Sequence, residues 1–340
     1  MAPGSNTRYY TGVQSKMLER PFLLFVPVAG SPHLVAPNLE AGPYSRSAAQ
    51  IVIHDWSDAQ GPRGAFDSLR KELRLSGRWG CEGRVPFGYL TQIRDRRLSL
   101  EPAEALLQSI REIKDGTELE MLKKAAAILA RAYLRIPEFA RAGATELEVA
   151  KALREEIFEL GGEAVDFCDV QAGANAADPH WAPSPAKLRA DEGFLIDSGC
   201  TIGGYNADIT RTFVLGRNAE VEAAYSDVLE AIEAGVAAVR AGATTGSVDA
   251  AARGRLEARG RGKQFFHRTG HGLGLEIHEQ PYIVPGGRER LRPGMVFTVE
   301  PGVYLAGRYG VRIEDDVVIT EKGAEVITEK VPKEFGWWKQ

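Results

Sequence analysis

The stretch DSGCTIGGYNADITRT, from Asp197 to Thr212, decides how the rest of the sequence is interpreted. Apolar residues flank it on both sides and Gly203-Gly204 divides it, which predicts a β-hairpin. A tight turn at the Ile202-Gly203 bond would make Asp197 and Asp208 direct cross-strand neighbours, with Cβ atoms about 4.5–5.5 Å apart. Carboxylates that close repel unless they share a proton or a cation. The pair is therefore either a metal site or two solvated aspartates beside a turn.

Length and composition indicate a globular protein of about two domains. The chain has 340 residues, of which 44% are hydrophobic and 26% charged. A net charge of −4 argues against nucleic-acid and anionic-membrane partners. No apolar run approaches the ~20 residues of a membrane-spanning helix, and the N-terminus lacks the apolar core of a signal peptide. The three cysteines are widely spaced, so we expect a reduced, cytoplasmic protein.

Residues 1–111 are predicted to form a small α/β domain. Short apolar runs at 22–26, 34–36 and 50–54 predict strands, and residues 64–75 have helical periodicity. His33 and His54 are isolated in the sequence, and we expect structural or surface roles for them. The second domain, 112–340, begins with a strongly helical pattern in which Thr117 and Glu120 resemble a capping box.

The second domain contains an internal repeat. The segment 141–145, RAGAT, recurs identically at 240–244, and each copy stands between two predicted helices. This context indicates a duplicated α/β unit. Counterparts of the hairpin aspartates are then Glu300 and Glu314, which are symmetric about Gly307 and flanked by strand-like sequence. A second cross-strand carboxylate pair is therefore predicted, and four carboxylates brought together require cations.

Histidines complete the predicted site. His271, in GHGLG, is the expected imidazole ligand, because the flanking glycines permit close backbone approach. Oxygen ligands with one imidazole suit Mn²⁺, Co²⁺, Fe²⁺ or Zn²⁺, and two such ions can activate water and polarise a carbonyl. A bend among the glycines would bring His278 into the same cleft as His271. The repeat pairs His278 with His180, and two imidazoles could stabilise an oxyanion and protonate a leaving nitrogen. The glycine run is not a dinucleotide-binding fingerprint.

The motifs DSGCTIGGYNADITRTF, HRTGHGLGLEIHE, GMVFTVEPGVY and GVRIEDDVVIT resemble those of the pita-bread metallopeptidase family. The resemblance covers residues 112–330. It implies an α+β pita-bread catalytic domain of two pseudo-symmetric halves, preceded by a smaller creatinase-like α/β domain. It also implies that two divalent ions, with Mn²⁺ favoured, are held by five ligands: Asp197, Asp208, His271, Glu300 and Glu314. Of these, Asp208 and Glu314 would bridge the two ions. Glu300 would in addition handle the proton, and His180 and His278 would contact the substrate.

The N-terminal domain resembles that of the proline-specific branch, the prolidases and Xaa-Pro aminopeptidases. This implies cleavage of the bond between an N-terminal residue and proline, with Xaa-Pro dipeptides favoured and a homodimeric assembly. Two alternatives within the fold are an aminopeptidase P acting on longer peptides and a small-amide hydrolase. A non-catalytic peptide-binding module is the alternative from another class.

Arginine side chains are the expected binders of the substrate carboxylate. Arg288 and Arg290 lie in an arginine-rich loop between two ligands, and Arg46 is a candidate from the first domain. An exposed, solubilising role is the alternative for each of them. Arg312, two residues before Glu314, is expected on the same strand face, where it could pair with a ligand carboxylate.

Overall fold

The computed structural model describes residues 1–93 and 96–339. The chain divides into two compact units, Met1–Arg111 and Glu112–Gln340. Each unit has its own hydrophobic core. Within the described residues, no helix is both long enough and apolar enough to cross a bilayer.

The N-terminal unit is a small α/β domain with two sheets. In the first sheet β2 lies between β1 and β3, antiparallel to β1 and parallel to β3, while β4 and β5 form a parallel pair. Its elements are α1 (Ser5–Thr11), β1 (Leu23–Phe25), β2 (His33–Pro37), α2 (Asn38–Ser45), β3 (Val52–Trp56), α3 (Arg63–Leu73), β4 (Gly77–Cys81), α4 (Phe87–Ile93), β5 (Leu98–Pro102) and α5 (Glu104–Arg111).

The apolar face of α3 explains how this unit holds together. Phe66 and Leu69, one turn apart, are fully buried and pack with Val35 and Trp56 of the sheet. The three predicted strands are confirmed as β1, β2 and β3, and the predicted helix is confirmed as α3, each within two residues of the expected bounds.

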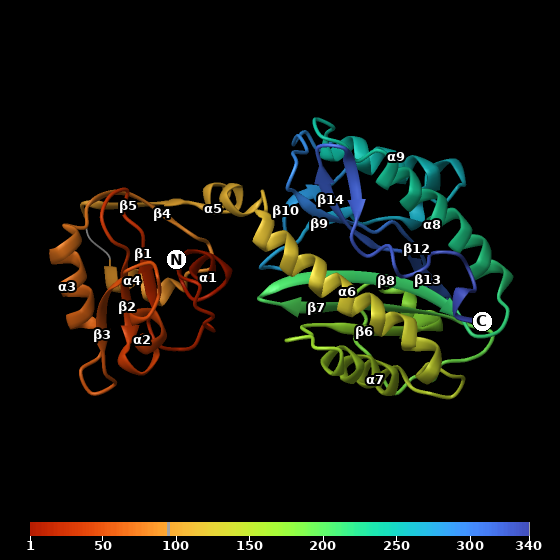
Figure 1. Cartoon of the computed structure of the whole chain (residues 1–340), viewed down its shortest axis with the longest axis horizontal. Coiled ribbons are helices and arrows are strands. Elements are labelled where there is room, and N and C mark those ends of the chain that lie inside the picture. The colour runs from red at the N-terminus through yellow and green to blue at the C-terminus, as the bar shows by residue number, and fades with distance from the viewer. Residues whose placement is uncertain (94–95, 340) are drawn as a thin grey trace. The chain divides into compact units, whose positions relative to one another are not determined.

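The C-terminal unit contains two α/β halves (Figure 1). In the first half α6 and α7 pack on the antiparallel sheet β6-β7-β8, and in the second α8 and α9 pack on strands that include β10, β11 and β13. The elements are α6 (Gly116–Phe139), α7 (Glu146–Glu159), β6 (Cys168–Ala172), η1 (Gly173–Ala177), β7 (Gly193–Ile202), β8 (Tyr205–Val214), α8 (Ala219–Ala237), α9 (Thr245–Ala258), η2 (Gly262–Gln264), β9 (Gly270–Gly272), β10 (Glu279–Ile283), β11 (Val296–Val299), β12 (Gly302–Leu305), β13 (Tyr309–Arg312), β14 (Asp315–Thr320), β15 (Gly323–Val326) and η3 (Trp337–Lys339).

Equivalent contacts in the two halves confirm the predicted duplication. The two RAGAT segments end in threonine N-caps, Thr145 for α7 and Thr244 for α9. In each copy the glycine has a positive φ, and its N–H donates to a leucine carbonyl: Gly143 to Leu188 and Gly242 to Leu291. The same five residues therefore make the same turn and the same long-range backbone hydrogen bond twice, as expected of a duplicated α/β unit.

The predicted capping box at the start of α6 was wrong by two residues. Asp115 is the N-cap, because its carboxylate accepts hydrogen bonds from the N–H groups of Thr117 and Glu118. The Glu118 carboxylate in turn accepts a hydrogen bond from the Asp115 N–H. Asp115 and Glu118 thus form the capping box, and Thr117 lies inside the first turn of α6.

The predicted register of the opening hairpin was also wrong. Ile202 pairs with Tyr205, so that Gly203 and Gly204 form a two-residue turn, both with positive φ. Asp197 therefore pairs with Thr210, and Asp208 with Gly199. The two aspartates are diagonal neighbours rather than direct ones, about 7–8 Å apart along the ladder. They still share one face, because the partner is displaced by two residues and the side-chain period is two.

The second carboxylate pair lies where one long hairpin is interrupted. Val299 pairs with Asp315 in the β11-β14 ladder, and Gly302 pairs with Arg312 in the β12-β13 ladder. Both ladders keep the same register, and neither includes Glu300 or Glu314. The two glutamates therefore stand opposite each other in the gap between the ladders, and their N–H groups donate to other segments, Glu300 to the Thr269 oxygen and Glu314 to the Thr210 oxygen.

Candidate metal centre

All five predicted ligands line one cavity of about 500 Å³ in the C-terminal unit. Each comes from a different backbone segment. The two aspartates project from one face of the β7-β8 hairpin, His271 is the middle residue of β9, and the two glutamates lie in the gap described above. The centre is thus assembled from residues up to 117 positions apart, from Asp197 to Glu314.

Close backbone packing holds His271 in place. Gly270 and Gly272 flank it, and a Cβ on either would overlap a backbone oxygen of a neighbouring strand, that of Thr298 or Gln280. The His271 N–H donates to the Thr298 hydroxyl at 3.2 Å, and the ring Nδ1 lies 3.1 Å from the Gly272 oxygen. The Gly272 carbonyl accepts a hydrogen bond from Nδ1–H, so Nε2 keeps its lone pair for a metal ion.

The ligand atoms converge around His271. Its Nε2 lies 3.5 Å from Glu300 Oε1 and 3.8 Å from Asp208 Oδ2. One ligand atom from each of Asp208, His271 and Glu314 lies within 4.8 Å of the others, and all three residues are buried. These separations are those of groups around a common cation.

The charges of the centre are unbalanced without a cation. Burial raises the pKa of Asp208 well above its ordinary value, and repulsion from Glu314 adds to the rise. The pKa of Glu314 is raised by burial and then by Glu300. Burial lowers the pKa of His271, so its ring is neutral. One oxygen each of Asp197 and Asp208 is buried without a hydrogen-bond partner. Orphaned acceptors, repelling carboxylates and a neutral imidazole fit bound divalent metal.

Arg312 joins the centre to the strands beneath it. Its Nη2 donates to Asp197 Oδ2 at 2.6 Å, its Nη1 to the Tyr304 hydroxyl at 2.9 Å and its Nε to the Thr210 hydroxyl at 3.1 Å. The Thr210 hydroxyl in turn donates to Glu314. Arg312 therefore fixes the orientation of Asp197 directly, and that of Glu314 through Thr210.

Three further histidines line the cavity: His180, His267 and His278. His180 lies in the turn after η1 and is exposed. His278 reaches the cleft because the chain bends between β9 and β10, and its ring meets that of His271 edge to face at 4.0 Å. Burial lowers the pKa of His278. The His278 imidazole is therefore neutral at neutral pH and lines the space beside the candidate ligands.

The arginines of the predicted carboxylate-binding loop lie elsewhere. Arg288 and Arg290 are exposed and do not line the cavity, and Arg290 donates instead to the Gly242 oxygen at 2.8 Å. Arg46 is exposed after α2 in the N-terminal unit. The cavity lining includes the predicted Arg312 and also Arg268, which was not predicted from the sequence. The Arg268 guanidinium lies 4.6 Å from the Tyr282 ring centre, and its charge opposes the rise in the pKa of Glu300.

Other residues of the cavity also escaped the sequence analysis. His267 Nε2 lies 2.9 Å from the Tyr304 hydroxyl, and burial lowers its pKa to about 3. Asp169, on β6, has its pKa raised to about 6 by burial and by Asp197. The signal for His267 and Arg268 was their position four and three residues before His271. Nothing local marked Asp169, which enters the cavity through the pairing of β6 with β7.

A model of metallopeptidase family M24 matches residues 120–321. The chain belongs to metallopeptidase family M24. Family M24 enzymes are metal-dependent hydrolases, and the chain is an enzyme of this kind. Its structure is similar to a prolidase from Thermococcus sibiricus, with a TM-score of 0.93 and 39% identity over 98% of this chain and 92% of that one. It is also similar to an X-Pro aminopeptidase from Thermotoga maritima, with a TM-score of 0.83 and 30% identity over 98% and 96%.

Among curated relatives, a probable dipeptidase PepE from Mycobacterium tuberculosis is 38% identical over 95% of this chain and 88% of its own length. These M24 relatives match both units of the chain. The pita-bread fold and the creatinase-like N-terminal domain expected from the sequence are thereby confirmed.

Proposed function

We propose that this M24 enzyme is an exopeptidase that hydrolyses the bond between an N-terminal residue and proline, with Xaa-Pro dipeptides as preferred substrates. The observation that carries the proposal is that one cavity is lined by the five candidate ligands and also by His180, His278 and Arg268. Similarity over both units to a prolidase and to a dipeptidase supports the substrate class.

The centre would hold two divalent ions, with Mn²⁺ favoured. Asp197, Asp208, His271, Glu300 and Glu314 would be the ligands, with Asp208 and Glu314 shared between the ions. Five ligands of which four are carboxylates suit hard or borderline ions better than a thiolate-type zinc site. When bound, such ions supply an activated water and polarise the scissile carbonyl.

The side chains around the ions would handle protons and position the substrate. Glu300 would accept a proton at its carboxylate from the attacking water and deliver it to the proline nitrogen, because it faces the cavity beside His271. His278 would donate a hydrogen bond to the oxygen that becomes negative, and His180 would contact the opposite side of the substrate. Arg312 would keep Asp197 oriented throughout.

Arg268 would bind the carboxylate of a dipeptide. Its guanidinium lines the cavity, is stacked on Tyr282 and has no ion-pair partner within the described residues. An unpaired guanidinium beside a substrate cavity is suited to a planar carboxylate. A cation at this point favours dipeptides, because a longer substrate carries an amide there instead.

An activity series tests the substrate class. The chelated enzyme, reloaded with Mn²⁺, is assayed with Xaa-Pro, Xaa-Pro-Yaa and non-proline dipeptides. We expect hydrolysis of Xaa-Pro to be fastest. Hydrolysis of only tripeptides or longer peptides would favour the aminopeptidase alternative, which the likeness to the Thermotoga maritima enzyme supports. Binding of peptides without hydrolysis, unaffected by Asp208→Ala, would favour a non-catalytic binding module.

The role of Arg268 is tested by Arg268→Ala, with Arg290→Ala as the matched control in an exposed loop. Loss of a charge-assisted pair should raise KM for Xaa-Pro roughly 10- to 100-fold while changing kcat little. KM for the corresponding Xaa-Pro amide, which lacks the carboxylate, should not change. Equal effects on both substrates would refute carboxylate binding by Arg268.

We also propose that the enzyme works in the cytoplasm as a homodimer. All three cysteines are free, and Cys168 and Cys200 are buried, which suits a reducing compartment. The dimer rests on the family resemblance. Sedimentation equilibrium of the purified chain tests it, and a single species of 37.0 kDa would refute it.

A further inference from the structure

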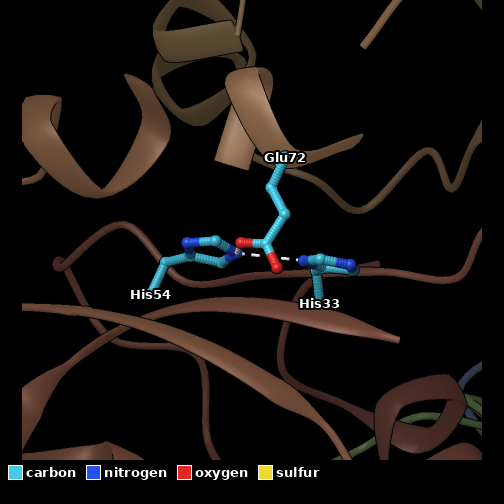
Figure 2. Close-up of side chains that lie close together, drawn as sticks. All are labelled: His33, His54 and Glu72. Atoms are coloured by element: carbon cyan, nitrogen blue, oxygen red, sulfur yellow. Dashed lines mark hydrogen bonds and ion pairs between the residues drawn. The ribbon is translucent and has the colours of Figure 1, made fainter. Parts of the chain in front are cut away.

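The N-terminal unit contains a second cluster of side chains able to ligate a metal, which shares no residue with the centre described above: His33, His54 and Glu72 (Figure 2). His33 Nδ1 lies 3.0 Å from His54 Nε2, and His54 Nε2 lies 3.7 Å from Glu72 Oε2. One ligand atom from each residue lies within 4.8 Å of the others. Both histidines are 7% exposed, whereas the Glu72 side chain is 52% exposed.

The fold brings these residues together from three elements. His33 begins β2 and His54 lies within β3, and in this parallel pair His33 is opposite Val52 while His54 is opposite Val35. The histidines are thus diagonal neighbours on one face of the sheet. Glu72 lies on α3, the helix that packs on that sheet, and Ser68 lies one turn before it on the same helix face.

We propose that His33, His54 and Glu72 bind a transition-metal cation of the zinc class. Ligand atoms at zinc-bond distance in a tetrahedron lie about 3.3 Å from one another. The separations of 3.0 and 3.7 Å fall on either side of that value, so small side-chain rotations suffice. Two imidazoles and one carboxylate are a donor set that suits Zn²⁺, and the exposed side at Glu72 leaves room for water as fourth ligand.

The surroundings prepare both nitrogens for a metal. Burial lowers the pKa of His33 and of His54, so both rings are neutral at neutral pH. His54 Nδ1 lies 3.1 Å from the Ser68 hydroxyl. A proton on Nδ1 directed at that oxygen leaves the Nε2 lone pair facing His33 and Glu72, the arrangement found around metal-bound histidines. In the absence of an ion, a hydrogen bond donated by His33 Nδ1–H to His54 Nε2 links the two histidines.

This site would connect two strands to α3 and is independent of the proposed hydrolysis. The full chain, freed of metal by a chelator, is titrated with Zn²⁺, and bound zinc per chain is measured after equilibrium dialysis. The hydrolytic centre also binds zinc, so each variant is examined in a background of Asp208→Asn with Glu314→Gln. We expect that background to retain one zinc per chain.

Glu72→Gln is the decisive variant, because its half-exposed position makes it harmless to folding, and Asp67→Asn is its control. Asp67 is an exposed acid of the same helix, paired with Arg70 outside the cluster. We expect Glu72→Gln to weaken the remaining zinc site at least tenfold, His33→Asn with His54→Asn to abolish it, and Asp67→Asn to leave it unchanged. Hydrolysis by Glu72→Gln in the native background should equal wild type. No zinc in the background chain, or equal affinity in Glu72→Gln and Asp67→Asn, would overturn the assignment.

Discussion

The buried carboxylate of Glu300 makes the stability of the metal-free enzyme depend on pH. Its side chain is 14% exposed, and burial raises its pKa from 4.5 to about 7, although Arg312 opposes the rise. The folded state therefore holds this proton more tightly than the unfolded chain. Stability falls as pH rises from about 4.5 to 7, and the cost above pH 7 is about 3 kcal/mol, since one pKa unit corresponds to about 1.4 kcal/mol.

Glu300→Gln should remove this cost, because glutamine is neutral at every pH. In chelated protein, the free energy of unfolding of the variant relative to wild type should increase by about 2.5 kcal/mol between pH 5 and pH 8. Urea unfolding at several pH values measures it. With Mn²⁺ present, wild type should be more stable than Glu300→Gln, because the variant lacks one charged ligand for the metal. Glu321→Gln, at an exposed glutamate, is the control. A difference that is the same at pH 5 and pH 8 in chelated protein would refute the reasoning.

Three further predictions concern residues in and around the centre. Arg211 is fully buried and its Nη2 donates to Asp315 at 2.8 Å, so Arg211→Met should destabilise the protein by about 3–5 kcal/mol in urea unfolding; a loss below 1 kcal/mol would contradict this. Gly270→Ala places a Cβ on the Thr298 oxygen and should lower Mn²⁺ affinity in a dialysis assay at least tenfold, whereas Gly254→Ala, with open space at Cβ, should not. His278→Gln should lower kcat roughly 10²-fold with Mn²⁺ stoichiometry unchanged, and an unaltered kcat would exclude it from catalysis.

The opening hairpin shows how far the sequence could lead. The face shared by Asp197 and Asp208 was predictable, because the predicted and observed registers differ by two residues and such a shift leaves every side chain on the same face. Their register was predictable too, had Gly203-Gly204 been given its usual role as both residues of a two-residue turn with positive φ. The error came from placing the turn at a bond instead of over two residues.

Other features depend on pairings that no local pattern reveals. Arg268 differs from Arg288 and Arg290 in the sequence by its place three residues before His271, and the path of the chain after η2 directs it into the cavity. His33 and His54 were each interpreted as isolated. They are 21 residues apart, and their contact requires the register of the parallel strands β2 and β3, which sequence alone leaves undetermined.

The interrupted hairpin that carries Glu300 and Glu314 has a consequence for how the chain can vary. Its turn, residues 306–308, is exposed and contacts no ligand, and exposed turns ordinarily accept insertions at little cost. Here the length of that turn sets the register of both ladders. One added residue, unless a bulge absorbed it, would turn Glu314 away from Glu300. Among related enzymes we expect the length of this solvent-exposed turn to be as restricted as the buried ligands themselves.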